Sequence, residues 1–321
     1  MSTTFKNRFG FVHLTLMAAL FVLINAIGST ARAEDMSCDR TCLKGMVDKY
    51  LAAMVAHDPS QAPFADNVKF TENGQALTLH DALWATASED SKYRLYVLDT
   101  QNQSAGFLGL LMEHENPVIY TLRLKIVDQK ITEAEQIVSR PRAGGFANVN
   151  GFDKPLPILM EKLKPSEQVS REEMMEAADH YFTGLDTENS GANVPFDPNC
   201  QRRENGTVTA NNPDGKGMAK MGCKAQFDTG FSALVSDVRD RRFPVIDTET
   251  GLIFTEVFFD HNGQTKEYTQ PDGTVVPINA PFTHPLTFEI AEIFKIKSGK
   301  IRQIEALINQ VPYRMPSGWS N

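Results

Sequence analysis

The sequence lacks the motifs that mark several common enzyme classes. Its 321 residues contain no G-x-S-x-G nucleophile elbow, no P-loop, no G-x-G-x-x-G dinucleotide fingerprint and no H-E-x-x-H zinc signature. Basic residues are also in deficit, because 32 lysines and arginines face 40 acidic residues and the formal net charge is −8. Nucleic acids and anionic membranes both attract basic surfaces, so the charge balance argues against both as partners.

Long hydrophobic runs are absent after residue 33, and the earlier one has the features of a signal peptide. Lys6 and Arg8 are positive, the stretch from Phe11 to Ile27 is mostly apolar, and Ala31-Arg32-Ala33 matches an A-x-A cleavage site. Because the apolar stretch is long for a signal, an uncleaved membrane anchor is the alternative. We expect removal of residues 1–33, which takes away three basic residues and leaves a net charge of −11. The mature protein is then expected to be periplasmic or secreted, without membrane contact.

The sequence does contain a long internal repeat. The segment from Pro63 to Gly74 reappears from Pro195 to Gly206, with six identical residues at an offset of 132. Further matches keep the same order, and the offset grows to 170 near the end, as expected if the second copy carries insertions. Two long copies predict a tandem of similar domains. We expect a first domain at 34–140, a linker rich in Gly, Pro and Asn at 141–169, and a second domain at 170–321.

Each copy is predicted to begin with an amphipathic helix and to continue with strands. Apolar residues spaced three and four apart predict helices over 43–55 and 174–185, and a shorter helix is expected over 79–87. A helix followed by an antiparallel meander is typical of an α+β fold. The predicted meander strands cover residues 94–99, 106–113, 118–127 and 130–139 in copy one, and 243–247, 252–260, 287–296 and 300–311 in copy two.

Cysteine is scarce, and all four cysteines lie after residue 33. An even number in an exported protein favours disulfides over free thiols. We predict the pairs Cys38–Cys42 and Cys200–Cys223, because each pair then stays within one copy and positions four apart on a helix lie within disulfide reach. A redox or metal site is the alternative, although no histidine lies near the C-x3-C segment.

This order of elements resembles the nuclear transport factor 2-like superfamily, which includes SnoaL-type polyketide cyclases, ketosteroid isomerase and scytalone dehydratase. The segments Phe258–His261, Ile293–Ile301 and Val311–Trp319 more specifically resemble an uncharacterised family of secreted two-domain proteins from bacteria and fungi. The resemblance implies two tandem cone-shaped domains, each an antiparallel curved sheet wrapped on N-terminal helices, with an apolar pocket at the open end. Since the superfamily mixes enzymes with binding modules, the fold alone does not decide function.

The two copies differ at Glu292, which stands where copy one has Leu122. Strand alternation puts Glu292 on the same side as Phe288, Ile290 and Phe294. A carboxylate on an apolar face loses hydration, so its pKa is expected to rise towards the value that a general acid or base needs. We therefore predict Glu292 as a catalytic residue. A solvated sheet face or an ion pair is the alternative.

Copy two also carries Glu256, Asp260 and His261 where copy one is mostly apolar. We predict His261 as catalytic, and Glu256, Asp260 and Arg242 as substrate-binding residues. The alternative for the two acidic residues is ion pairing with the nearby arginines. Adjacent strand residues point to opposite faces, so Asp260 and His261 are not expected to share a metal ion, and no metal or other cofactor is predicted.

Three aromatic residues complete the candidate site. Tyr181 lies on the apolar face of its predicted helix and is expected to direct its hydroxyl into the pocket, with a purely structural role in the core as the alternative. Tyr313 and Trp319 are predicted to bind substrate. The Glu-Asn pairs at 72–73 and 204–205 occur in both copies and are expected to shape turns.

These features predict an exported, cofactor-independent lyase or isomerase that acts on a small carbonyl compound in the second-domain pocket. Glu292 or His261 would move a proton next to the carbonyl, and Tyr181 or Tyr313 would donate a hydrogen bond to the enolate. The main alternative is a non-catalytic periplasmic or secreted protein that binds a small molecule and in which copy one stiffens copy two. A third hypothesis is an interaction module whose sheets pair within the chain, and we expect a monomer or homodimer.

Overall fold

The computed structural model describes residues 37–141 and 147–319, so the predicted signal peptide lies outside the described residues. Within these ranges the chain is a mixed α+β protein with two six-stranded sheets, a two-stranded ribbon and few helices. None of the described helices is long and apolar enough to cross a membrane. The α+β class predicted from the order of elements is therefore confirmed.

The first sheet follows helix α1 (Arg40–Val55), which packs on β3 and β4. The strand order across this sheet is β2-β1-β6-β5-β4-β3. Its elements are β1 (Phe64–Glu72), β2 (Gln75–Ala76), α2 (Leu83–Thr86), β3 (Ala87–Asp99), β4 (Ser104–Glu113), β5 (Asn116–Val127) and β6 (Lys130–Ser139).

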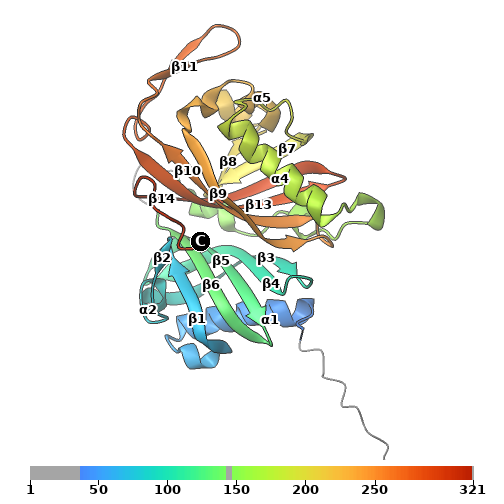
Figure 1. Cartoon of the computed structure of the whole chain (residues 1–321), viewed down its shortest axis with the longest axis vertical. Coiled ribbons are helices and arrows are strands. Elements are labelled where there is room, and N and C mark those ends of the chain that lie inside the picture. The colour runs from blue at the N-terminus through green and yellow to red at the C-terminus, as the bar shows by residue number, and fades with distance from the viewer. Residues whose placement is uncertain (1–36, 142–146, 320–321) are drawn as a thin grey trace, which may run out of the picture. The chain divides into compact units, whose positions relative to one another are not determined.

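The second sheet follows helix α4 (Arg171–Asp186), which lies across it in Figure 1 and contacts β9, β10, β13 and β14. The strand order is β8-β7-β14-β13-β10-β9, so it repeats the order of the first sheet. The short helix α3 (Pro157–Met160) precedes α4. The remaining elements are β7 (Phe196–Glu204), β8 (Thr207–Ala210), α5 (Cys223–Phe227), β9 (Asp237–Asp247), β10 (Leu252–His261), β11 (Glu267–Thr269), β12 (Val275–Pro277), β13 (Leu286–Lys297) and β14 (Lys300–Val311).

The expectation of fully antiparallel sheets is wrong at one strand pair in each sheet. β1 runs parallel to β6, with Phe70 beside Ala134, and β7 runs parallel to β14, with Arg202 beside Ile304. Hairpin turns enforce antiparallel pairing only between strands that follow one another in the chain. Because several strands separate β1 from β6 and β7 from β14, no tight turn sets their relative direction.

Both long helices form where the apolar spacing predicts them, and both are capped at the start. The side chain of Asp39 accepts a hydrogen bond from the backbone N–H of Cys42 at the start of α1. In α4, Ser170 and Glu173 form a reciprocal capping box. Such caps satisfy the first N–H groups of a helix, which have no partner within the helix itself.

Two strands begin earlier than the alternation predicts, β3 at Ala87 and β9 at Asp237. Their first residues are mostly polar and carry no period-2 signal, so backbone pairing with β4 and β10 defines them instead. The helix predicted over 79–87 is correspondingly shorter. The β11–β12 ribbon has no counterpart among the predicted strands, because both strands are three residues long and largely exposed.

The outer faces of the two sheets pack against each other. Leu95 and Ile119 of the first sheet share one buried apolar cluster with Phe254 and Ile293 of the second. Each inner face has a separate core under its own helix. This contact agrees with the hypothesis that the two copies satisfy a sheet-to-sheet interface within one chain.

The predicted disulfides are present. Cys38 is bonded to Cys42 with an S–S distance of 1.95 Å, and Cys200 is bonded to Cys223 at 2.13 Å. The second bond joins β7 to helix α5, which carries Phe227 against the ring of Tyr181 at a centroid distance of 5.1 Å. The Cys200–Cys223 bond therefore attaches helix α5, which lies beside Tyr181, to strand β7.

Candidate functional site

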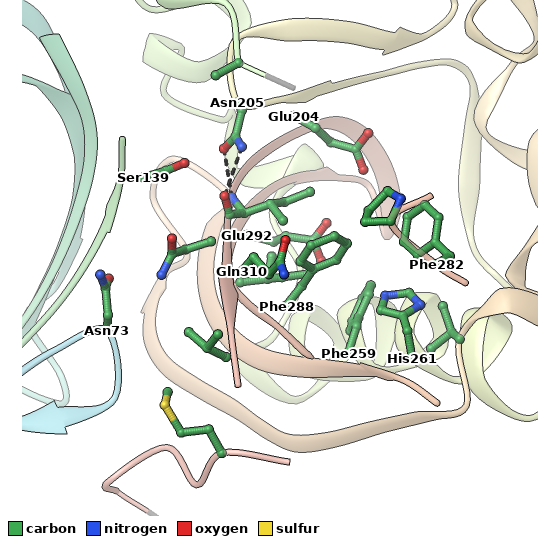
Figure 2. A pocket seen from close by; sticks show the side chains of 18 of the residues that line it. Asn73, Ser139, Glu204, Asn205, Phe259, His261, Phe282, Phe288, Glu292 and Gln310 are labelled. Atoms are coloured by element: carbon green, nitrogen blue, oxygen red, sulfur yellow. Dashed lines mark hydrogen bonds between the residues drawn. The ribbon is translucent and has the colours of Figure 1, made fainter. Parts of the chain in front are cut away.

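The inner face of the second sheet borders a cavity of about 1080 Å³. Residues of α4, β7, β10, β13 and β14 form its walls, and Asn73, Gln75 and residues 138–141 of the first half lie along one side. Figure 2 shows the side chains of Glu292, Phe288 and His261 around this cavity. A cavity of this size takes a ligand at least as large as a typical drug molecule.

Larger side chains fill the corresponding place in the first half. Tyr120 and Gln136 stand there, at the repeat offset of 170 from Ile290 and Ala306. The hydroxyls of Tyr50 and Tyr120 both donate to Gln136 Oε1, at 3.1 and 3.0 Å, and all three side chains are buried. The smaller isoleucine and alanine of the second half leave room for the cavity.

Glu292 lies in this cavity on the inner face of β13, as strand alternation predicts, and is 2% exposed. The hydroxyl of Tyr181 donates to Glu292 Oε1 at 3.3 Å, whereas Oε2 has no hydrogen-bond partner among the described residues. Burial, reinforced by the charge of Glu204, raises the pKa of Glu292 to about 8. The side chain is therefore protonated and uncharged at neutral pH, which argues against the solvated alternative.

Arg202 on β7 is a site residue that the sequence analysis does not include. Its Nη1 donates to the Tyr181 hydroxyl at 3.4 Å, its Nη2 donates to Gln226 Oε1 at 2.6 Å, and its Nε lies 3.3 Å from Glu204 Oε1. The internal repeat does hold a signal for it. Arg202 stands at the offset of 132 from Phe70, so a buried cation replaces a core aromatic residue.

His261, the last residue of β10, also lines the cavity and is buried. Its Nδ1 lies 2.9 Å from the carbonyl oxygen of Leu234, and a carbonyl only accepts, so Nδ1 carries the hydrogen. Its Nε2 has no hydrogen-bond partner within the described ranges. The rings of Phe282 and Phe288 lie 4.8 and 5.1 Å from the imidazole, and burial lowers its pKa to about 4. At neutral pH, His261 therefore presents an uncharged nitrogen with a free lone pair.

The structure does not bring Glu256 or Arg242 to the cavity. Both lie in the interface between the sheets, where Arg242 Nη1 is 3.1 Å from Glu256 Oε2. Arg242 also donates to both carboxylate oxygens of Glu135 in the first sheet, at 2.9 and 2.6 Å. Burial and the charge of Glu135 raise the pKa of Glu256 to about 8. Strand alternation turns Glu256 away from the cavity, so its carboxyl group lies beside Arg242, as in the ion-pair alternative, although its raised pKa leaves it uncharged at neutral pH.

Asp260 is also absent from the cavity wall, because it precedes His261 on β10 and points to the opposite face. Arg239 Nε donates to Asp260 Oδ2 at 2.9 Å, and the hydroxyl of Thr287 donates to Oδ1. The carboxylate is fully buried in these contacts. For Asp260, too, the ion-pair alternative is the one that the geometry supports.

Tyr313 and Trp319 follow β14 and do not line the cavity. Tyr313 is largely exposed, whereas the indole N–H of Trp319 donates to Thr71 Oγ1 of the first sheet at 2.8 Å. Lys69 Nζ and the guanidinium of Arg123 lie 4.0 and 4.3 Å from the Trp319 ring. Trp319 therefore packs on the first sheet, and Tyr181 rather than Tyr313 is the tyrosine that lines the cavity.

The Glu-Asn pairs shape turns in both copies, as predicted. Asn73 Oδ1 accepts from the backbone N–H of Val138 at 2.8 Å, and Asn205 Oδ1 accepts from that of Ile308 at the same distance. Both asparagines also donate to the carbonyl of the same partner residue. Their amides are thus occupied by the backbone of β6 and β14, although both residues border the cavity.

The cavity contains a proton donor and a proton acceptor that are both uncharged at neutral pH. Glu292 holds a proton next to the Tyr181 hydroxyl, and His261 holds a free lone pair. No group of three or more histidine, cysteine, aspartate or glutamate side chains suited to bind a metal ion occurs within residues 37–141 and 147–319. The chemistry offered by these residues is proton transfer.

Part of the chain is similar to a family of unknown function. The family model described as "Domain of unknown function (DUF8021)" matches residues 167–308, which span α4 and nearly all of the second sheet. No curated protein matches the sequence.

Several solved structures are similar to parts of the chain. They include a de novo designed protein with a curved β-sheet (15% identity, TM-score 0.26), which covers 44% of this chain and 88% of its own. A protein of unknown function with a cystatin-like fold from Methylobium petroleophilum PM1 has 12% identity and a TM-score of 0.28, over 35% of this chain and 85% of its own. AusH from Aspergillus nidulans has 14% identity and a TM-score of 0.28, and the match covers 44% of this chain and 86% of AusH.

Proposed function

We propose that this protein is an exported, cofactor-independent lyase or isomerase whose active site is the cavity of the second half. The observation that carries the proposal is a pair of uncharged groups in one cavity. Glu292 keeps a proton, His261 keeps a lone pair, and each has one atom without a partner among the described residues. An acid and a base whose environments drive their pKa values in opposite directions are typical of proton-transfer enzymes.

In the proposed reaction, His261 is the general base. Its Nε2 takes a proton from the carbon next to a carbonyl group, and the electron pair of that C–H bond forms a C=C bond to the carbonyl carbon. The C=O pair moves to oxygen, which becomes an enolate. The hydrogen bond from Nδ1 to Leu234 supports this role, because it fixes the tautomer and orients the ring.

Glu292 and Tyr181 are the proposed acid side of the site. The carboxyl group of Glu292 donates a hydrogen bond, or its proton, to the developing enolate oxygen. Tyr181 holds the carboxyl in place at 3.3 Å. A carboxylic acid kept neutral by an apolar site can stabilise an oxyanion in this way. Arg202 is a positioning residue, since its bond to the Tyr181 oxygen directs the tyrosine proton towards the carboxyl group.

The fate of the enolate decides between the two reaction types. In an isomerase, protonated His261 returns the proton to a different carbon of the conjugated system. In a lyase, the electron pair expels a leaving group from the neighbouring carbon, and the leaving group receives the proton. Both routes balance without a cofactor, and both use the same three side chains.

We also propose a tandem of two cone-shaped domains of the nuclear transport factor 2-like type, at 34–140 and 170–321, joined by a linker at 141–169. The identical strand order of the two sheets and the helix on each inner face support this division. The first domain would stiffen the second through the packed outer faces. The two disulfides are compatible with a periplasmic or secreted location.

Hydrogen–deuterium exchange of a ketone tests the proposal without knowledge of the natural substrate. Purified protein in D₂O is incubated with 2-tetralone, an uncharged bicyclic ketone, and loss of the proton signals next to the carbonyl is followed by NMR. The wild type is expected to accelerate exchange, and Glu292→Gln and His261→Gln each to lower the rate by at least about 100-fold. Glu176→Gln, an exposed position on the same helix as Tyr181, is the matched control.

Two results would count against catalysis. Wild-type activity in Glu292→Gln would remove this carboxyl group from the mechanism. Tight binding of 2-tetralone without any accelerated exchange would instead favour the non-catalytic binding protein, because the cavity would then hold the ketone without moving its proton.

A further inference from the structure

The charged groups that line the cavity are already paired within the protein. Arg202 lies 3.3 Å from Glu204 Oε1, and its remaining donors are directed to Thr209, Tyr181 and Gln226 at 3.2, 3.4 and 2.6 Å. The guanidinium is buried, so these partners replace the water that it would otherwise bind. Each of its three nitrogens therefore already has a partner within the protein.

Arg140, the second arginine among the residues that line the cavity, is partly exposed and is paired through two of its three nitrogens. Its Nε and Nη2 donate to the two carboxylate oxygens of Glu113 at 2.6 and 2.8 Å. Nη2 also lies 3.4 Å from Glu72 Oε1. A bidentate pair of this kind is among the strongest arrangements that a carboxylate forms, and a ligand anion would have to displace it.

A negatively charged ligand would also meet acidic groups. Glu204 lines the cavity and its side chain is partly exposed, while Glu72 and Glu113 are the acidic partners of Arg140. Elsewhere the wall is largely apolar and includes the rings of Phe231, Phe259, Phe282 and Phe288. Transfer of an unpaired charge into such surroundings is strongly unfavourable, whereas a flat apolar body fits them.

We propose that the cavity selects an uncharged carbonyl compound with a flat, apolar body, such as an aryl ketone, ester or lactone, and rejects the corresponding carboxylate. The carbonyl oxygen accepts from the protonated Glu292, and the apolar body lies against the phenylalanine rings. This inference rests on the proposed function of the cavity and names the class of substrate that it takes. Glu204 is the residue that sets the charge preference, because it neutralises Arg202.

A matched pair of probes tests the selection. 2-Acetylnaphthalene and 2-naphthoate have nearly the same shape, but only the second is charged at pH 7. Their dissociation constants for the full-length mature protein are measured by quenching of naphthalene fluorescence. We expect the ketone to bind at least about tenfold more tightly than the carboxylate. Equal binding, tighter binding of 2-naphthoate, or no binding of 2-acetylnaphthalene up to its solubility limit would overturn the proposal.

The variant Glu204→Gln tests the assigned residue. It removes the charge beside Arg202 and leaves a guanidinium without a counterion, so affinity for 2-naphthoate is expected to rise about tenfold while that for 2-acetylnaphthalene changes less. Glu176→Gln is the control with the same loss of charge outside the cavity. An unchanged ratio of the two affinities in Glu204→Gln would show that Glu204 does not set the preference. Wild-type selectivity is measured independently, so misfolding of the variant would not hide the answer.

The comparison of the two probes and the exchange experiment have distinguishable negative results. If Glu292→Gln keeps the exchange activity but the ketone is still preferred, the catalytic role is wrong and the charge selection stands. If exchange depends on Glu292 but both probes bind equally, the catalytic role stands and the charge selection is wrong.

Discussion

Arg171 binds Asp99 through two parallel hydrogen bonds, Nη1 to Oδ1 at 3.0 Å and Nη2 to Oδ2 at 2.7 Å. Arg171 is the first residue of α4, and Asp99 is the last residue of β3 in the other sheet. The same pair occurs a second time with the copies exchanged, since Arg40 at the start of α1 binds both oxygens of Asp247 at the end of β9. Each helix is thus fastened at its start to the sheet of the other copy.

We predict that this exchange of partners makes the two halves unfold together. Asp99→Asn leaves Arg171 without its charged partner, and loss of one member of a buried pair is expected to cost about 2 to 4 kcal/mol of unfolding free energy. Urea denaturation followed by near-ultraviolet circular dichroism should show one transition, shifted as a whole. The exposed pair Lys224–Asp228 supplies the control, because Lys224→Gln should cost less than about 0.5 kcal/mol. Two separate transitions would contradict the prediction.

Glu292 is expected to reduce stability, and to do so more as pH rises. Its folded-state pKa of about 8 lies above the usual 4.5, so between these values the unfolded chain releases a proton that the folded chain keeps. Wild-type stability should therefore fall relative to Glu292→Gln between pH 5 and pH 8, by about 2 to 4 kcal/mol. Unfolding free energies of both proteins across this range test the sign. A constant difference would mean that the carboxyl titrates normally.

The exchange reaction should have a bell-shaped pH dependence. His261 must be neutral to act as a base and Glu292 must be protonated to act as an acid, so kcat/KM should rise near pH 4 and fall near pH 8. Glu204→Gln should move the upper limb to lower pH, because the charge of Glu204 helps to raise the pKa of Glu292. Replacement of Arg202 by Met should move the same limb the other way. Limbs that stay in place in both variants would show that neither residue acts on Glu292.

Ile290→Tyr should close the cavity by restoring the side chain that copy one has at Tyr120. The added ring would occupy space that the smaller residue leaves, and binding of 2-acetylnaphthalene is expected to weaken at least about 100-fold. Val275→Tyr places the same ring on the exposed strand β12 and should bind like the wild type. Circular dichroism checks that the fold is retained. Unchanged binding in Ile290→Tyr would place the ligand elsewhere.

Much of the candidate site is predictable from comparison of the two copies. The period of two along β13 puts Glu292 on the face that Leu122 occupies in copy one, and that face is buried. The same comparison at the offset of 132 aligns Arg202 with Phe70, so the positioning residue can also be predicted from the sequence. Both signals depend on a local pattern and a reliable register.

The roles of Glu256 and Asp260 depend on what covers the outer face of the second sheet. Alternation turns both away from the cavity, but an outward carboxylate could equally face water. Only the folded chain shows the first sheet and the C-terminal segment there, with Arg242 and Arg239 as partners. The contact that covers this face from the first sheet, Arg242 with Glu135, joins residues 107 positions apart and leaves no periodic trace in the sequence.

The repeat, the two long helices, the disulfide pairs and the apolar face that carries Glu292 can all be predicted from the amino-acid sequence, because each depends on short-range spacing or on register. The parallel pairing of β1 with β6, the packing of the outer faces and the pairing of the cavity arginines are visible only in the folded chain. These features arise from packing between distant segments, where volume and charge must be complementary in three dimensions. The same packing removes water from Glu292 and His261 and so gives them their opposite pKa shifts.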